Sequence, residues 1–147
     1  MTCNIKTIQK ILIPTDGSDH SVCAAEFGIS MAKTLGAQIM VVNVIDELVL
    51  NEISKGAFRE NVEAELKADG QRYIKYVASL AEKEGVKADS LLTKGRPFEQ
   101  IVHLAKDLNI DLIVMGTSGQ GGANKILIGS VTERVIEYST CPVLVVK

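Results

Sequence analysis

A short apolar run followed by closely spaced glycines is the part of the sequence best suited to bind a phosphate group. Leu112, Ile113, Val114 and Met115 precede Gly116, and so short a run is typical of a strand buried on both faces of a parallel sheet. Glycine then recurs at positions 116, 119, 121 and 122. Because glycine has no Cβ and tolerates positive φ, another group can approach the backbone amides of this stretch closely.

A helix is expected to begin directly after these glycines. The segment Ser-Val-Thr-Glu from Ser130 to Glu133 fits the capping box, which predicts a helix N-terminus at Ser130. The first N–H groups of a helix lack partners within the helix and attract anions. Strand, glycine loop and helix start together predict a phosphate site, although glycines of this kind can also form a connecting loop that binds nothing.

Composition narrows the classes of function. The chain has 147 residues, a net charge of -2 and a pI of about 5.7, so it lacks the positive field that would hold nucleic acid or an anionic membrane. Aromatic residues are only 4% and tryptophan is absent, so a platform for stacking unpaired bases is lacking too. We expect a single domain, residues 1–147, with an aliphatic core and no nucleic-acid partner.

Cysteine usage and hydropathy indicate a cytoplasmic protein. Cys3, Cys23 and Cys141 are odd in number and contain no CxxC pair, which fits a reducing compartment better than a disulfide framework. The N-terminus lacks the apolar core of a leader peptide, and no apolar run approaches the roughly 18 residues of a membrane helix. We therefore expect no membrane partner.

Apolar spacing predicts strands and helices in alternation. Strands are expected at residues 11–14, 39–46, 91–92, 112–115 and 143–146. Helices are expected at residues 19–35, 58–84, 97–108 and 130–139, with C-terminal stops at Gly36, Gly85 and Asn109 and with Pro97 at a helix start. Residues 47–57 show no clean period.

Two of the helices have an apolar face that the spacing assigns residue by residue. In the helix at 130–139, Val131, Val135 and Tyr138 are expected to be buried. In the long helix at 58–84, the expected apolar face consists of Phe58, Val62, Leu66, Tyr73, Val77 and Leu80.

The alternation predicts an α/β fold, a doubly wound, Rossmann-like, five-stranded parallel sheet with helices on both faces. In the strand order 3-2-1-4-5, the first and fourth strands are neighbours at the point where the winding reverses, and ligands bind at that point. The carboxyl ends of these two strands carry Pro14-Thr15-Asp16 and residues 116–119. Fold and glycine pattern therefore indicate the same crevice.

The chain resembles the universal stress protein family over essentially its whole length, in the segments ILIPTDGS, IVMGTSGQGGANKILIGSVTERV and CPVLVVK. The spacing of Gly116, two residues, Gly119, nine residues and then Gly129-Ser130 is the G-x2-G-x9-G-[ST] pattern of the ATP-binding branch of that family. The resemblance implies an ATP-binding protein of the stress response or of regulation, which acts as a homodimer through its last strand, Val143 to Val146.

The resemblance also implies a set of binding residues, drawn from three strand ends and one helix start. The first strand would line the nucleoside end of ATP, and the second would present its backbone to the adenine. The end of the fourth strand would surround the ribose and the first phosphates, and the helix start would hold the outer phosphates. In chain order the set is Pro14, Thr15, Asp16, Val44, Met115, Gly116, Gly119, Gly129, Ser130, Val131 and Thr132.

The phosphates need more positive charge than a helix start supplies. No Walker lysine follows the glycines, so Mg or Mn bound with ATP, or Lys125, would have to contribute. His20 lies near Asp16 and Asp19, and His103 lies within a predicted helix. We interpret both histidines as surface residues, because neither has a second ligand at metal spacing. The sequence thus predicts neither a catalytic residue nor a metal site made by the protein alone.

Other functions remain open on the same fold. The crevice, with Asp16 near the phosphates, could hydrolyse ATP or transfer its γ-phosphoryl group slowly, but the sequence identifies neither a positioned base nor a strong cationic clamp. We therefore expect a binding protein rather than an enzyme. A signalling receiver would need an acidic acceptor after the third strand, where the chain has Lys94-Gly95-Arg96. A protein that dimerises without binding nucleotide is a further alternative.

Overall fold

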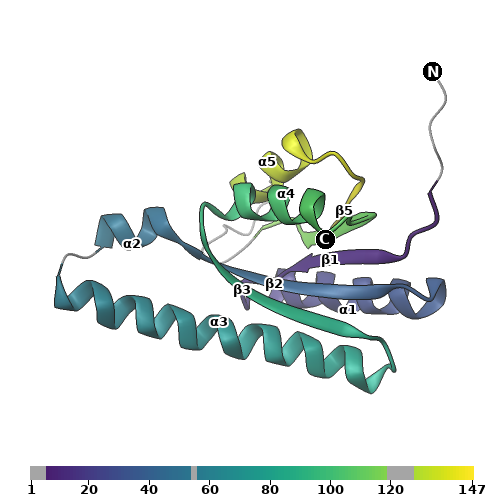
Figure 1. Cartoon of the computed structure of the whole chain (residues 1–147), viewed down its shortest axis with the longest axis horizontal. Coiled ribbons are helices and arrows are strands. Elements are labelled where there is room, and N and C mark those ends of the chain that lie inside the picture. Colours follow the sequence, from purple (N-terminus) through teal and green to yellow (C-terminus); the bar gives the residue numbers. More distant parts are fainter. Residues whose placement is uncertain (1–5, 54–55, 119–127) are drawn as a thin grey trace.

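The computed structural model describes residues 6–53, 56–118 and 128–147. Within these ranges, five parallel strands form one sheet in the order β3-β2-β1-β4-β5, which confirms the predicted α/β fold and strand order. The elements in chain order are β1 (Lys10–Pro14), α1 (Asp19–Leu35), β2 (Gln38–Asp46), α2 (Glu47–Ile53), α3 (Ala57–Lys83), β3 (Ala88–Gly95), α4 (Pro97–Asp107), β4 (Leu112–Gly116), α5 (Ser130–Tyr138) and β5 (Val143–Val146) (Figure 1).

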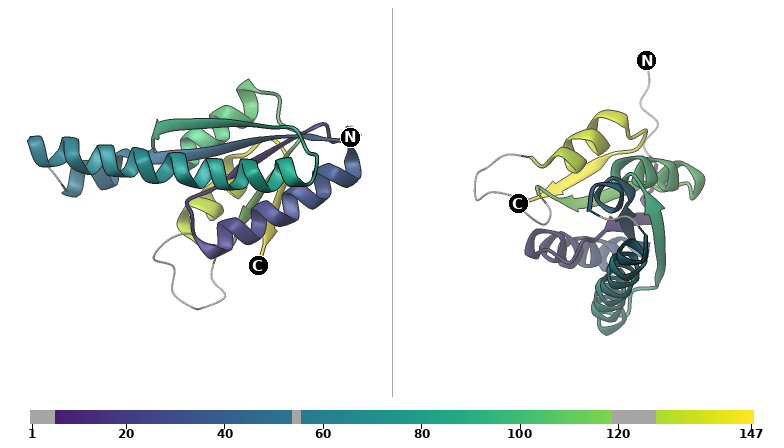
Figure 2. Two further views of the ribbon diagram at one scale, coloured as in Figure 1. Left: turned by 90° about the horizontal axis from the view of Figure 1, so that it is seen from below. Right: turned by 90° about the vertical axis from the view of Figure 1, so that its left-hand side faces the viewer.

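Helices cover both faces of the sheet. Helices α1 and α3 lie on one face and helices α4 and α5 on the other (Figures 1 and 2). A larger buried cluster fills the α1 and α3 side and includes Ile13, Val77 and Val114, while a smaller one on the other side includes Leu12, Ile113 and Val135. Because β1 and β4 sit centrally, their side chains enter both clusters in alternation. This double burial is what the short apolar runs predicted.

Most helix ends lie where the sequence placed them. Ser18 caps α1 by accepting the N–H of Ser21, and Gly36 ends that helix in the left-handed conformation. Pro97 opens α4, and Asn109 adopts a φ of 53° after its end. These boundaries were predictable because caps and stops depend on residue types within one turn of the helix end.

Helix α2 was not predicted. Residues 47–57 show no period, yet Glu47–Ile53 is helical. The Leu48 N–H donates to Asp46 Oδ1 at 2.9 Å, which provides a partner for one of the N–H groups that a helix start leaves free. Only Leu50 is buried, because a helix of about two turns places so few side chains against the core that no apolar period develops.

The predicted apolar face of α3 is wrong at its N-terminal end. Phe58 is 62% exposed, and the buried positions of the helix are Gly70, Ile74, Val77 and Ala81. A helix of 27 residues is about 40 Å long, which exceeds the length of the eight-residue strand β3 beside it. Figure 1 shows the start of α3 passing beneath α2, beyond the end of the sheet. The apolar spacing correctly predicted a helix, but the sheet and its buried core do not extend as far as the N-terminal end of α3, so Phe58 is not covered.

The prediction for α5 is corrected at three residues. Val131 is 36% exposed and Tyr138 is 51% exposed, whereas Thr132 and Val135 face inward.

The residue that caps the helix is Gly129 and not Ser130, because the Glu133 N–H donates to the Gly129 carbonyl at 2.9 Å. Ser130 is therefore the first helical residue, and the capping box does not form as predicted.

A membrane-crossing helix is absent from the ranges that the structure describes, since none of their helices is both long enough and apolar enough.

Candidate functional site

A pocket of about 560 Å³ opens at the carboxyl ends of β1, β2 and β4. This is the edge at which parallel doubly wound sheets bind ligands. One side of the pocket, which we call the strand-end wall, consists of Pro14, Thr15, Asp16, Met115, Gly116 and the α5 start from Gly129 to Thr132. A second group of lining residues, which we call the helix wall, consists of Val49 from α2 and Leu66, Asp69 and Tyr73 from α3.

The first part of the strand-end wall is a turn that leaves β1. The Thr15 N–H donates to the Val42 carbonyl at 2.8 Å and so extends the β1–β2 ladder by one residue. The Ser18 N–H donates to Asp16 Oδ1 at 3.0 Å, and Thr15 Oγ1 lies 3.2 Å from Ser21 Oγ in α1. These contacts join the strand to the helix start through a compact turn.

The second part of the strand-end wall joins β4 to α5. The Thr132 hydroxyl donates to the Gly116 carbonyl at 2.9 Å, and the Gly129 N–H donates to the Thr117 carbonyl at 2.6 Å. A Cβ on Gly116 would lie 2.8 Å from the His20 carbonyl oxygen, so only glycine lets β4 and α1 approach as they do. The helix start is therefore fixed against the strand end.

The start of α5 is suited to an anion. Its N-cap, Gly129, has no side chain to accept from the first-turn amides, and Ser130 and Val131 line the pocket beside it. A helix N-terminus carries the equivalent of about half a positive charge. An anionic group in the pocket could accept hydrogen bonds from these amides, as phosphates do at other helix starts.

The helix wall was missing from the sequence prediction. Leu66, Asp69 and Tyr73 are three and four residues apart, so they lie on one face of α3. Asp69 forms an ion pair with Arg72, and the Tyr73 ring lies so close to Gly17 that a Cβ there would overlap it. The sequence did contain a signal, since Leu66 and Tyr73 belong to the predicted apolar face of this helix. That signal was read as core packing only.

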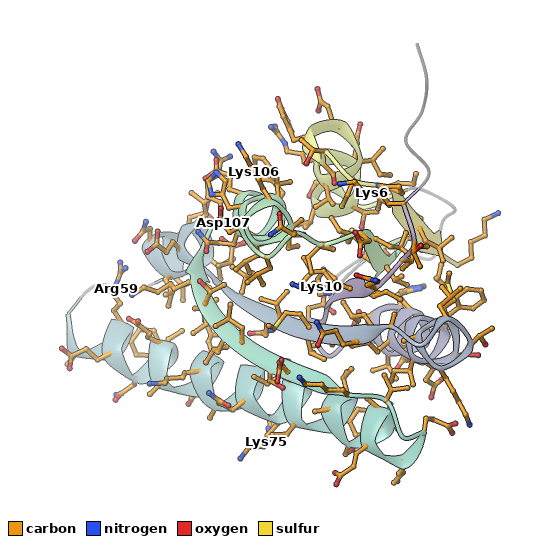
Figure 3. All side chains as sticks on the ribbon, turned by 45° about the vertical axis from the view of Figure 1, so that its right-hand side comes forward. Lys6, Lys10, Arg59, Lys75, Lys106 and Asp107 are labelled. Atoms are coloured by element: carbon orange, nitrogen blue, oxygen red, sulfur yellow. The ribbon has the colours of Figure 1, made fainter. Side chains whose placement is uncertain are left out.

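The described lining of the pocket contains negatively charged side chains but no positively charged ones. Among the described residues that line it, Asp16, Asp46 and Asp69 carry carboxylates, and none is Lys, Arg or His. Figure 3 shows the labelled lysines Lys75 and Lys106 on the outer sides of α3 and α4. No cluster of three or more metal-ligating side chains occurs in the parts of the chain described. Positive potential inside the described pocket therefore comes from backbone amides.

The predicted binding residues meet in this pocket as far as the structure describes them. Gly119 and Lys125 lie outside the described residues. Every other predicted binding residue lines the pocket, namely Pro14, Thr15, Asp16, Val44, Met115, Gly116, Gly129, Ser130, Val131 and Thr132. Their contacts with ATP remain a prediction. His20 and His103 are both exposed, at the start of α1 and within α4.

Comparison with known proteins gives matches along nearly the whole chain. The sequence model of the universal stress protein family matches residues 7–147. Universal stress protein MJ0531 of Methanocaldococcus jannaschii is 43% identical over 139 residues, which are 95% of this chain and 82% of that protein. The solved structure of MJ0577 from the same organism has a TM-score of 0.82 at 32% identity and covers 97% of both chains.

A further solved structure bears on ligands of this fold. The universal stress protein of Archaeoglobus fulgidus in complex with dAMP has a TM-score of 0.71, with 97% of this chain and 100% of that chain covered. Its sequence is 21% identical to this chain, so the likeness is one of fold.

Proposed function

The chain belongs to the universal stress protein family, and from this premise we propose that it is an ATP-binding member. In this proposal, bound nucleotide changes the shape or the partners of the protein in the stress response, and residues 1–147 act as one nucleotide-binding domain in the cytoplasm. The observation that carries the proposal is that all the predicted binding residues within the described ranges line one pocket.

The size and polarity of the pocket support a nucleotide. A volume of about 560 Å³ lies within the range of roughly 300–1,000 Å³ typical of small-molecule sites. We place the phosphates at the α5 start, where Ser130 adds a hydroxyl to the amides, and the base beside Val44 on β2. The Archaeoglobus fulgidus protein that is in complex with dAMP has the same fold, which supports an adenine nucleotide as a ligand class that this fold can bind.

We further propose that Mg or Mn accompanies the phosphates. Three carboxylates and no cationic side chain belong to the described pocket lining, so a bare triphosphate would be repelled. A divalent cation that bridges phosphate oxygens would lower this repulsion. ATP affinity should therefore fall when the cation is chelated.

The last strand supports a homodimer. β5 is at the edge of the described sheet and pairs only with β4 there, and each of its residues is half-buried. An apolar edge of this kind tends to pair with another chain. Val145 is the residue to change, because Leu144, Val146 and Val143 pack against the buried clusters. Val145→Lys should shift the protein from dimer to monomer in analytical ultracentrifugation. A dimer that the substitution leaves unchanged would exclude the β5 edge as the dimer interface.

The direct test of ATP binding begins with freshly purified protein. It is denatured, and any released nucleotide is identified by liquid chromatography and mass spectrometry, with calorimetry of added ATP and Mg²⁺ as the second measurement. Stoichiometric ATP, or a saturable heat, would support the proposal. Neither released nucleotide nor heat would reject it and leave a family member that acts through dimerisation.

Two glycine variants separate binding from folding. The backbone of Gly129 has φ -65° and ψ 157°, which any residue adopts, but a Cβ there would lie 3.3 Å from Ser118 Cα. Gly129→Val should therefore fold with some loss of stability, while its side chain fills the space before the α5 amides. Gly36 has a φ of 68° and nothing within 4 Å of its Cβ position, so Gly36→Val should lose stability and keep binding. ATP binding by Gly129→Val equal to that of the unmodified protein would reject the assigned phosphate position.

The same preparations test the enzymatic alternative. Phosphate release from ATP is measured with and without Mg²⁺. We expect at most slow turnover, since the described pocket has no cationic side chain to stabilise the transferring phosphoryl group. Rapid turnover that Asp16→Asn abolishes would make the protein an ATP hydrolase instead.

A further inference from the structure

A buried amide side chain lies directly behind the turn that leaves β1. Asn43 of β2 is 8% exposed, and its Nδ2 donates to the Thr15 carbonyl at 2.8 Å, a contact between residues 28 positions apart. A carbonyl oxygen can only accept, so the NH₂ group of the amide, and not its oxygen, must face Thr15. Asn43 was not among the predicted binding residues, although it lines the pocket.

Some of the hydrogen bonds of the turn that Asn43 contacts join residues within the turn or at the start of α1. The Gly17 N–H approaches Thr15 Oγ1 at 3.4 Å, and the Ser18 N–H donates to Asp16 Oδ1 at 3.0 Å. Such local bonds fix the shape of a turn but not its position relative to the sheet. Two hydrogen bonds that join the turn to β2 are the ladder bond from the Thr15 N–H to the Val42 carbonyl and the bond from Asn43.

Helix α3 holds the Asn43 side chain from the other side. A Cβ on Gly70 would overlap Asn43 Oδ1 and would lie 2.7 Å from Leu92 Cδ1, so the amide packs directly on the helix backbone. One turn later, the Tyr73 ring packs on Gly17, which has a φ of +79°. Because space behind the amide is filled, Asn43 has little freedom to turn its NH₂ group away from Thr15.

We propose that Asn43 is a positioning residue for the nucleotide site, which helps to hold the Thr15–Gly17 turn in place through its hydrogen bond to the Thr15 carbonyl. The inference rests on the proposed nucleotide-binding function and extends it to a residue that need not contact the nucleotide. Asp16, at the centre of the turn, is the predicted ligand whose place depends on this bond. A displaced turn would weaken nucleotide binding even if the N-terminal amides of α5 stayed in place.

The test uses the substitution Asn43→Asp, which keeps the shape and removes the donor. A carboxylate at position 43 would bring its oxygen close to the Thr15 carbonyl oxygen, and neither of these two acceptors can donate a hydrogen bond. A protonated carboxyl could again donate to the Thr15 carbonyl. Burial beside a carbonyl oxygen raises the pKa of a carboxyl, so protonation is expected by about pH 5. Asn43→Asp should therefore bind ATP about tenfold more weakly than the unmodified protein at about pH 8 and recover at about pH 5.

Other titratable groups share the pocket and require controls. They are Asp16 at the end of β1, Asp46 at the end of β2, and Asp69 and Tyr73 on α3. The unmodified protein measured at each pH accounts for these groups and for the nucleotide phosphates. Asn43→Leu has no donor at any pH and should bind weakly throughout. Asn109→Asp makes the same chemical change at an exposed residue before β4, at the other end of the sheet, and should match the unmodified protein.

A second measurement does not depend on nucleotide. In the ligand-free protein, hydrogen exchange of the Gly17 and Ser18 amides should be about tenfold faster in Asn43→Asp at about pH 8 and in Asn43→Leu than in the unmodified protein at the same pH. Equal exchange would overturn the positioning role, even if the unmodified protein bound no ATP and the proposed function had failed. If ATP does bind, equal affinity of Asn43→Asp at about pH 8, or a deficit that persists at about pH 5, would overturn it too.

Discussion

The two walls of the pocket differ in what they present to a ligand and in how firmly they are held. The strand-end wall comes from central strands with buried side chains and from a helix start that Thr132 ties to β4. The helix wall consists of residues from a short helix and from the middle of α3, and none of them is buried. Its Val49 is 37% exposed.

From this difference we expect the helix wall to tolerate substitutions better than the strand-end wall. Changes in the strand-end wall should alter stability and binding together, because the same backbone serves the core and the ligand. Changes in the helix wall should alter binding with less effect on folding, since fewer buried contacts depend on it. The following four substitutions test this contrast.

The largest effect is expected from Gly116→Val in the strand-end wall. The new Cβ would lie 2.8 Å from the His20 carbonyl oxygen and 2.9 Å from its carbon, both of them backbone atoms of α1. We expect a loss of about 1–3 kcal/mol in the free energy of unfolding, together with loss of ATP binding. Urea denaturation and calorimetry measure the two effects. Unchanged stability would show that β4 and α1 can separate, and the wall would not be rigid.

A smaller effect is expected from Thr132→Val in the same wall. The substitution keeps the branched shape but removes the donor to the Gly116 carbonyl, in a side chain that is 4% exposed. We expect the free energy of unfolding to fall by about 1–2 kcal/mol and ATP binding to weaken as the α5 start loosens. Thr132→Ser keeps the hydroxyl and should lose less of both. Equal losses in the two variants would mean that packing, and not the hydrogen bond, fixes the helix start.

The helix wall is tested by Tyr73→Ala. The ring lines the pocket and packs on Gly17, so its removal should weaken ATP binding about tenfold while stability falls less than in Gly116→Val. Tyr73→Phe keeps the ring and serves as the matched control in calorimetry and urea denaturation. A stability loss as large as that of Gly116→Val would remove the contrast between the walls.

The smallest effect is expected from Glu63→Gln, which breaks an exposed ion pair between α3 and β3. A hydrogen bond from Lys94 at 2.8 Å and the lysine charge lower the pKa of the Glu63 carboxyl below its ordinary value of 4.5. Because the folded pKa is lowered, the pair stabilises the fold above the unfolded pKa, and this stabilisation is lost as the pH falls through the folded pKa.

The measurement for Glu63→Gln is the unfolding midpoint at several pH values. The variant should be slightly less stable than the unmodified protein at about pH 7, and the difference should vanish at about pH 2 to 3. It should also shrink in high salt, since the pair is exposed. A difference that grows as the pH falls would show that Lys94 does not act on this carboxyl.

Much of the fold followed from short-range signals. Apolar runs bounded by glycine or proline located the central strands, and Gly36, Pro97 and Asn109 marked helix ends within a residue or two. The alternation of elements and the preference for right-handed crossovers predicted a doubly wound sheet. Among the doubly wound orders, 3-2-1-4-5 was the one predicted, and it places the first and fourth strands side by side. The strand-end wall was predictable for the same reason, because its residues directly follow strands or start a helix.

The rest could not be read from local patterns. Phe58 continues the helical apolar spacing of α3 but lies beyond the sheet, and Val131 and Tyr138 lie on the outer side of α5. Helix α2 is too short to show a period. The helix wall depends on where α3 lies relative to the strand ends, and the spacing of apolar residues within α3 does not give that position.

The sequence alone was enough to predict the strands, the helices other than α2 and the strand ends that form a crevice, since strand runs, caps and stops depend on residues close together in the chain. The packing of the elements decided which residues of α2 and α3 line that crevice and that Asn43 reaches Thr15, which are contacts between residues distant in sequence. It also decided that Gly129 and not Ser130 caps α5, since the Gly129 N–H donates to the Thr117 carbonyl beyond β4. All of these features depend on how the helices pack against the sheet, and short-range patterns in the sequence do not specify that packing.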